Sequence, residues 1–234
     1  MMSERLNNRK NDELRNITIE KDFTKHAMGS VLISFGDTKV LVTASVEEGK
    51  PKWMDKEDPR GWVTAEYSLL PSSTNTRTAR ERSKVSGRTH EIQRLIGRSL
   101  RACVDLTKLG ERTITIDADV LQADGGTRCA SICGGFVALK IAIDKLIQQG
   151  LLEQSPIIEE IGAVSIGIVG GELKLDLDYS EDSNADVDSN IVLTKSGKII
   201  EFQTTAEKEP MDKTTLDRIY NLAHQAIKEI ISKY

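Results

Sequence analysis

The sequence predicts an α+β fold of two similar halves, each made of β-hairpins followed by a helix. Short segments in which apolar and polar residues alternate are separated by glycine-containing turns, as is typical of hairpins. Three longer segments, at about 89–104, 129–149 and 216–234, repeat apolar residues at helical spacing instead. No linker separates the halves, at about 15–150 and 160–234, so we expect one domain over residues 1–234.

The first half begins with hairpin and strand patterns. Alternating residues from Gly29 to Val46 turn at Gly36-Asp37, which predicts a hairpin. A strand is expected from Gly61 to Leu70. The following segment, Pro71 to Gly87, is rich in polar residues and arginine and has no apolar stripe, so we expect a loop that is mobile without a ligand.

The remainder of the first half is expected to form helix, strand and helix. Apolar residues three and four apart indicate a helix from Thr89 onward. Alternation from Thr113 to Val120 predicts a strand. The next helix is expected from about Cys129 to Gln149, with Gly150 ending it as a C-cap.

The second half repeats the plan. Strands are expected at Ala163 to Val169 and Leu173 to Asp178, joined by a Gly170-Gly171 turn and followed by an acidic loop. Asn190 to Ala206 is expected to form another hairpin. An amphipathic helix from Leu216 to Tyr234 then covers the sheet.

Charge is strongly segregated although the net charge is only −4. Between Arg77 and Arg101 the chain carries eight basic residues, seven of them arginine, and two acidic ones. The planar arginine fork matches phosphate oxygens, so this run favours contact with phosphate or nucleic acid. Between Glu172 and Asp188 seven acidic residues accompany one lysine, which suits divalent cations. The alternative for each run is an ordinary solvated surface.

The segment Asp124-Gly125-Gly126-Thr127-Arg128 lies where a predicted strand meets a predicted helix. Paired glycines allow a tight turn whose N–H groups converge, and the helix N-terminus adds partial positive charge. This arrangement predicts an anion pocket, although the segment lacks the Gly-Lys-Ser/Thr ending of a Walker loop. A tight turn with a helix cap is the alternative.

Asp182 and Asp188 lie in the acidic segment that follows a predicted strand. Magnesium often takes only one or two protein carboxylates, with water and substrate phosphates as its other ligands. The segment lacks the glycine of an EF-hand loop, so a calcium loop of that type is excluded. An acidic surface loop is the alternative to a magnesium site.

Other reactive residues give weaker signals. The three histidines have no ligand spacing, and no nucleophile motif such as GxSxG is present. Cys129 and Cys133 stand four residues apart in an apolar helix, which fits neither a disulfide framework nor a metal knuckle, so we expect all three cysteines to be core thiols. No long apolar run suggests a membrane span, and Met1 to Lys10 has no signal-peptide core, so a cytoplasmic protein is expected.

Five blocks distributed over nearly the whole chain together resemble the signature blocks of the ribonuclease PH family. These blocks are Gly61–Pro71, Gly87–Arg101, Asp119–Arg128, Leu177–Ser183 and Glu201–Glu207. The resemblance implies the fold of duplicated βαβα-type halves that is called ribosomal-protein-S5-domain-2-like. It also implies a homo-hexameric ring, assembled as a trimer of dimers.

The same resemblance implies a phosphate-dependent 3′ to 5′ exoribonuclease, a nucleotidyltransferase that trims tRNA precursors and other 3′-tailed RNA. Inorganic phosphate would be the co-substrate and nucleoside diphosphates the products. By position, Arg88, Gly126, Thr127 and Arg128 would bind phosphate, Asp182 and Asp188 would hold magnesium or manganese, and Arg77, Arg80 and Arg82 would bind RNA. Arg88, Arg128, Asp182 and Asp188 would be the catalytic residues.

Three other functions remain open at this point. A catalytically silent ring subunit of an exosome-like assembly would keep the fold but lose the phosphate and metal residues, all of which are present here. An RNA-binding or assembly factor is the second alternative. A small-molecule kinase of related fold is the third, and the chain lacks a glycine-rich nucleotide loop for it.

Overall fold

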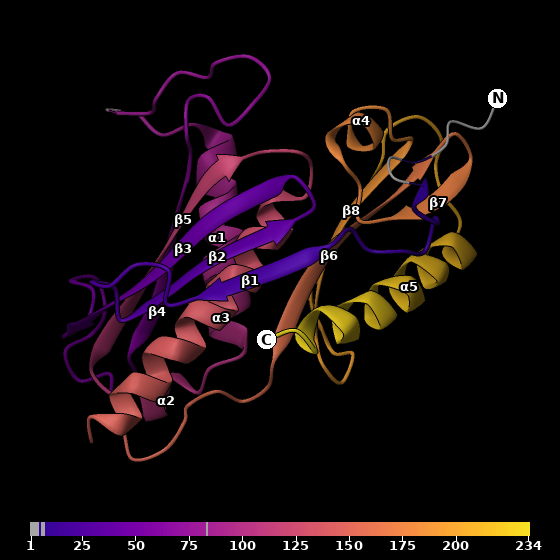
Figure 1. The fold of residues 1–234 in the computed structure, drawn as a ribbon. Coiled ribbons are helices and arrows are strands. Elements are labelled where there is room, and N and C mark those ends of the chain that lie inside the picture. Colours follow the sequence, from indigo (N-terminus) through magenta and orange to yellow (C-terminus); the bar gives the residue numbers. More distant parts are fainter. Residues whose placement is uncertain (1–4, 6–7, 83) are drawn as a thin grey trace.

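The described part of the chain forms two β-sheets, one in each half (Figure 1). The computed structural model describes residues 5, 8–82 and 84–234, so part of the Met1 to Lys10 segment behind the targeting prediction lies outside the described residues. The predicted α+β class with two sheet-containing halves is confirmed. No helix among the described residues is both long and apolar enough to cross a lipid bilayer.

The first sheet has the strand order β1-β2-β3-β5-β4. Its strands are β1 (Ile17–Lys21), β2 (Gly29–Phe35), β3 (Thr38–Glu48), β4 (Trp62–Leu69) and β5 (Arg112–Gln122). Strands β4 and β5 are parallel, and the other pairs are antiparallel. Helices α1 (Gly87–Ala102) and α2 (Leu106–Leu109) lie in the connection between β4 and β5, because parallel neighbours require a crossover.

The second sheet is entirely antiparallel, with the strand order β7-β6-β8-β9. Its strands are β6 (Ile161–Val169), β7 (Glu172–Leu175), β8 (Val187–Thr194) and β9 (Ile199–Ala206). The short helix α4 (Tyr179–Asp182) stands between β7 and β8, and α5 (Lys213–Ile231) ends the half. Buried residues Ile219, Ala223 and Ile227 place one face of α5 against the core, as its spacing predicts.

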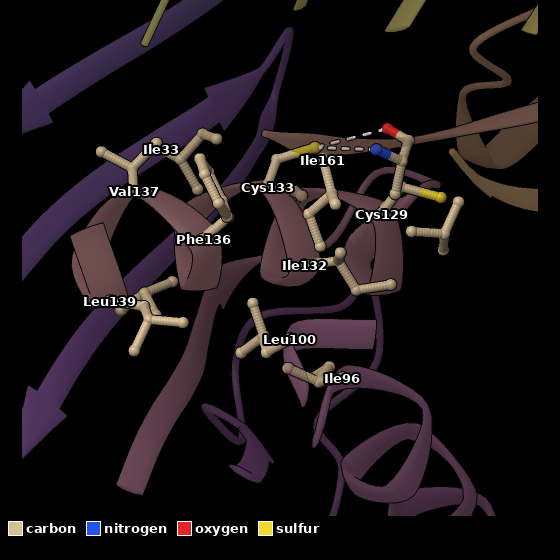
Figure 2. Packing of buried hydrophobic residues seen from close by; sticks show 14 of the residues in the cluster. Ile33, Ile96, Leu100, Cys129, Ile132, Cys133, Phe136, Val137, Leu139 and Ile161 are labelled. Atoms are coloured by element: carbon tan, nitrogen blue, oxygen red, sulfur yellow. Dashed lines mark hydrogen bonds between the residues drawn. The ribbon is translucent and has the colours of Figure 1, made fainter. Parts of the chain in front are cut away.

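Helix α3 (Thr127–Gln148) joins the two halves through one continuous core. On one side, a Cβ at Gly134 would lie 2.8 Å from Ile33 and Val42, so β2 and β3 pack directly on the helix backbone. On the other side, the Cys133 sulfur accepts a hydrogen bond from the Ala163 N–H at 3.2 Å (Figure 2). All three cysteines are buried free thiols, as predicted.

The structure corrects several predicted boundaries and adds three short elements. Asp188 lies within strand β8, which begins at Val187, and not in an acidic loop as predicted. Strand β1 and helices α2 and α4 were not predicted. Helix α1 begins at Gly87 because the Ser86 side chain accepts a hydrogen bond from the Thr89 N–H. Where the structure describes it, the predicted loop from Pro71 contains neither helix nor strand up to Ser86, whereas Leu70 lies outside β4 and Gly87 already belongs to α1.

Candidate active site

A cleft of about 460 Å³ lies where the two halves meet. Its walls come from the end of β4, the start of α1, the start of α3, helix α4 and strand β8. A larger hollow of about 610 Å³ beside Lys208 and Asp212 contains none of the predicted site residues. Chemistry, and not size, therefore distinguishes the 460 Å³ cleft.

The cleft collects six of the predicted site residues from separate parts of the sequence. They are Arg88, Gly126, Thr127, Arg128, Asp182 and Asp188. Arg77, Arg80 and Arg82 do not line the cleft and are exposed on the segment between β4 and α1. The adjoining residues Thr74, Asn75 and Thr76 do form part of its wall, so the arginine segment leads away from the cleft edge.

The glycine turn gives α3 an uncapped N-terminus at the cleft wall. Gly125 and Gly126 both adopt left-handed conformations, with φ of 73° and 67°, which glycine tolerates without strain. No side chain caps α3, whereas Asp178 caps α4 and Asp212 caps α5. The first amide groups of α3 therefore remain available, and such groups bind anions.

Two contacts orient the side chains that follow the turn. The Thr127 hydroxyl lies 3.0 Å from the hydroxyl of Tyr67, a buried residue of β4. Arg128 donates a hydrogen bond to the side-chain oxygen of Gln203 on β9 at 3.2 Å and lies 3.5 Å from the Glu91 carboxylate. Thr127 and Arg128 are thus held at the cleft by residues from both sheets.

Two arginines of the basic run have structural contacts. Arg98 forms a two-pronged ion pair with Glu201, with both N–O distances at 2.8 Å. Arg101 lies 4.3 Å above the Trp62 ring and donates a hydrogen bond to the Val63 carbonyl oxygen. Both stabilise the packing of α1, so these two arginines of the run already have protein partners.

Asp182 and Asp188 form the acidic side of the cleft. Burial raises the pKa of both carboxyl groups, and the negative charge of Asp182 raises the pKa of Asp188 further, while the Arg128 charge opposes both shifts. Asp188 Oδ2 accepts a hydrogen bond from Asn190 at 3.3 Å, whereas its buried Oδ1 has no partner among the described residues. A buried carboxylate oxygen without a partner is costly unless something binds it.

This donor set fits magnesium better than a cation that needs a full protein cage. Where the chain is described, no group of three or more His, Cys, Asp or Glu residues is placed to hold a metal ion. Magnesium usually takes one or two carboxylates and completes its octahedron with water and phosphate oxygens. The free Oδ1 of Asp188 and the Asp182 carboxylate provide such a pair.

Two family models match most of the chain. A model described as the 3′ exoribonuclease family, domain 1, matches residues 13–143, and a model of domain 2 of the same family matches residues 160–226. The chain belongs to the 3′ exoribonuclease family. The resemblance to ribonuclease PH is therefore confirmed at the level of the family.

Solved structures support the fold of this exoribonuclease-family protein. Rice Rrp46 has a TM-score of 0.79 at 19% identity, with 97% of each chain covered. A structure described as the Archaeoglobus fulgidus exosome with RNA bound to the active site has a TM-score of 0.80 at 23% identity, covering 99% of this chain and 92% of that one. An archaeal exosome core has a TM-score of 0.77 at 23% identity, covering 97% and 89%.

In this exoribonuclease-family protein, sequence reasoning missed the residues that hold the glycine turn and the side chains of Thr127 and Arg128 in place. Tyr67 and Gln203 lie inside the blocks that resemble ribonuclease PH, which is the only sequence signal for them. Arg15 and Thr38 contact the glycine turn through hydrogen bonds that span 86 to 110 positions of the sequence. No local pattern points to such contacts.

Proposed function

We propose that the protein is a phosphate-dependent 3′ to 5′ exoribonuclease that trims the 3′ ends of tRNA precursors and other 3′-tailed RNA. The observation that carries this proposal is the meeting of phosphate-type donors and two carboxylates in one cleft. An oxygen of inorganic phosphate attacks the last phosphorus of the RNA, and the P–O3′ bond breaks. The products are a nucleoside diphosphate and an RNA that is shorter by one nucleotide.

Arg88, Arg128 and the start of α3 bind the attacking phosphate in this proposal. A phosphate dianion approaching an anionic diester is repelled, and the repulsion grows as water is excluded from the site. Two guanidinium groups and the uncapped amide groups after Gly126 neutralise that charge. Thr127 adds a hydroxyl that Tyr67 holds in place. These groups also align the nucleophile, and positioning contributes much of phosphoryl-transfer catalysis.

Asp182 and Asp188 would hold magnesium, or manganese, in the same cleft as Arg88 and Arg128. When bound, the cation stabilises the negative charge that develops on the reacting diester and orients it. The partnerless Oδ1 of Asp188 supports this assignment.

Arg77, Arg80 and Arg82 bind the RNA backbone outside the cleft. Their exposed positions on the segment between β4 and α1 leave the guanidinium groups free to reach phosphates. We propose a hexameric ring, a trimer of dimers, because assembly brings several such segments to one opening and compensates for a net charge of −4. The similarity to exosome core structures, one of them with bound RNA, supports a ring that binds RNA.

A catalytically silent ring subunit of an exosome-like assembly is the second candidate, and the similarity to exosome core structures fits it equally well. The two proposals differ in turnover. Purified protein is incubated with a short 3′-tailed RNA and magnesium, with and without inorganic phosphate, and the released mononucleotide is identified. Nucleoside diphosphates formed only with phosphate support phosphorolysis, and nucleoside monophosphates formed without it indicate hydrolysis. No product from a preparation shown to be a ring supports the silent subunit.

A further inference from the structure

The glycine turn of the cleft is held from behind by two residues that do not line the cleft. We propose that Arg15 and Thr38 are positioning residues that fix the Asp124–Gly126 backbone so that the N–H groups of Gly125 and Gly126 face the phosphate. This inference rests on the proposed function of the cleft. It adds a mechanism that maintains an anion pocket made largely of backbone.

Arg15 donates hydrogen bonds to the carbonyl oxygens of the turn. Its Nη1 lies 2.6 Å from the Asp124 oxygen, and its Nη2 lies 3.4 Å from the Gly125 oxygen. The carbonyl and N–H of a trans peptide point in opposite directions. By holding these two oxygens behind the turn, Arg15 directs the N–H groups of Gly125 and Gly126 to the opposite side, where both residues line the cleft.

Thr38 makes a second, independent set of contacts with the same peptides. Its hydroxyl donates to the Gly125 oxygen at 2.6 Å and accepts from the Asp124 N–H at 2.9 Å. Thr38 begins strand β3 and is fully buried, so its position is fixed by the first sheet. The Gly125 carbonyl is therefore restrained from two directions.

Arg15 itself is anchored by a buried carboxylate. Asp176 accepts from Arg15 Nε at 3.0 Å, from Nη2 at 2.7 Å and from the Arg15 backbone N–H at 2.8 Å. Asp176 is 1% exposed and has a left-handed backbone with φ of 53°, which is uncommon for aspartate. The charge of Asp176 raises the pKa of Arg15 despite the opposing effect of burial. The guanidinium thus has one fixed orientation.

Arg15 lies behind the turn and does not line the cleft, so it is not placed as a direct phosphate ligand. It lines a separate hollow of about 270 Å³ together with Asn16, Asp37 and Asp178, and it is absent from the cleft wall. A Cβ at Gly126 would lie 2.9 Å from Arg15 Nη2, so the guanidinium packs directly on the back of the turn. Arg15 therefore contacts the phosphate side of the cleft through the backbone of the turn, although its charge also opposes the rise in the pKa of Asp182.

A glycine pair needs such restraints because its peptides reorient easily. A reversed Gly125 peptide would present a carbonyl oxygen to the phosphate and lose an N–H donor. We therefore expect loss of Arg15 or Thr38 to weaken phosphate binding specifically, while RNA binding outside the cleft is retained.

The test compares Arg15→Gln and Thr38→Val with Arg9→Gln as the matched control. Arg9 donates to the Asp176 carbonyl oxygen at 2.7 Å, lies 3.6 Å from the Asp176 carboxylate and pairs with Glu181 at 3.2 Å, but in the described part of the chain it has no hydrogen bond to the turn. Two readouts are used: KM for phosphate at saturating RNA, and the Kd of inorganic phosphate from thermal stabilisation without RNA. Arg15→Gln is expected to raise both the KM and the Kd for phosphate about 10- to 100-fold, because hydrogen bonds from a charged group are lost. Thr38→Val is expected to raise them about 5-fold, because the lost hydrogen bonds are neutral. Arg9→Gln should change the KM and the Kd for phosphate by no more than about twofold, even if it lowers Tm as much as the other two variants do.

Unchanged phosphate KM and Kd in both variants, with wild-type protein binding phosphate, overturns the inference and leaves the proposed function intact. If Arg15→Gln fails to fold, the nearly isosteric Thr38→Val decides the same question. Equal losses in the Arg9→Gln control also overturn it, because the effect is then a general consequence of weakening the buried ion pairs. Failure of the wild-type protein to bind phosphate overturns both the inference and the proposed function.

Discussion

The hydroxyl oxygens of Tyr67 and Thr127 lie 3.0 Å apart and join strand β4 to the first residue of α3. Burial raises the pKa of Tyr67, so its phenol stays protonated and is able to donate at neutral pH. When the phenol donates, a lone pair of Thr127 is occupied and the Thr127 proton is left for the phosphate. In that arrangement Tyr67 sets the direction in which Thr127 donates.

We predict that Tyr67→Phe raises KM for phosphate about 3- to 10-fold, the usual effect of one lost hydrogen bond. The value of kcat for RNA at saturating phosphate should change less. Initial rates measured against phosphate concentration test this. Tyr220→Phe is the control, because its hydroxyl donates to the Gly197 oxygen outside the cleft. A Tyr67→Phe protein with wild-type KM would show that Thr127 needs no such partner.

Asp182→Asn and Asp188→Asn are each predicted to reduce turnover at least 100-fold while RNA binding is kept, because cation binding is lost. Asp186→Asn is the matched control, since Asp186 pairs with Lys208 and does not line the cleft. Turnover in the Asp188 variant equal to that of the control would remove Asp188 from the site.

The stability of the Asp188 variant should change in the opposite direction from its activity. The raised pKa of Asp188 means that the folded protein holds this proton more tightly than the unfolded chain. Its ionisation therefore costs stability as pH rises through the folded pKa, and at pH 7 without divalent cations Asp188→Asn should have an equal or higher Tm. Added magnesium should raise the Tm of the wild type only. Thermal melts with and without magnesium measure both effects.

Replacing Arg77, Arg80 and Arg82 together with Ala should weaken RNA binding and its salt dependence. Three contacts with single-stranded phosphates correspond to a decrease of up to about 2 in the slope of log K against log salt. Binding is measured across salt concentrations. A control with the same charge change replaces the exposed residues Lys195, Lys213 and Lys228, which lie outside the basic run. An equal decrease in the control would mean that net charge, and not the arginine segment, governs binding.

The long elements could be predicted from the sequence because burial imposes their periodicity. In α5 the buried residues recur at helical spacing, and in β5 the buried and less buried residues alternate. Strand β1 lacks this signal, since only Ile17 of its residues is buried and its place depends on pairing with β2. Helices α2 and α4 have four residues each and are too short for a period to be visible.

The site could be predicted only in part, for a related physical reason. Arg128 and Asp182 have the side-chain chemistry that phosphate and cations require, so their type and local setting point to a role. Asp188 was predicted in a loop because its neighbours are polar, but pairing with both β6 and β9 makes the segment a strand. Arg15, Thr38 and Tyr67 act through contacts between segments far apart in the sequence, and only the folded chain reveals them.

The cysteine thiols are predicted to be unreactive in the folded protein. Burial raises the pKa of Cys103 to about 12 and that of Cys133 to about 11, and it raises the pKa of Cys129 well above its usual value. At pH 8 almost no thiolate is present to react. A disulfide reagent such as DTNB should therefore titrate no thiol within minutes in native protein and three in denaturant. Rapid reaction of one thiol in the native state would indicate local opening, around α3 for Cys129 or Cys133 and at the end of α1 for Cys103.

Gly125→Ala is predicted to damage both stability and turnover, because the turn packs against the start of α4. A Cβ at this position would lie 2.5 Å from the Leu177 carbonyl oxygen and 2.9 Å from the Tyr179 nitrogen, which are backbone atoms that side-chain rotation does not relieve. The left-handed φ of 73° adds strain of about 1 kcal/mol. Gly170→Ala is the control. Gly170 also has a positive φ, 61°, but no described residue beyond its chain neighbours lies within 4 Å of the position that its Cβ would take.

Separation of the turn from α4 moves the phosphate side of the cleft away from Asp182, so Gly125→Ala should lose more than 100-fold in turnover and unfold at least about 2 kcal/mol more easily than Gly170→Ala. Urea unfolding and phosphorolysis rates of the two variants measure the difference. Equal unfolding free energies would show that α4 yields to the added methyl group. If turnover were lost although the unfolding free energies were equal, the spacing between the turn and α4 would be required for the reaction itself. In that case the added methyl group would shift α4 without destabilising the fold, and the shift alone would prevent turnover.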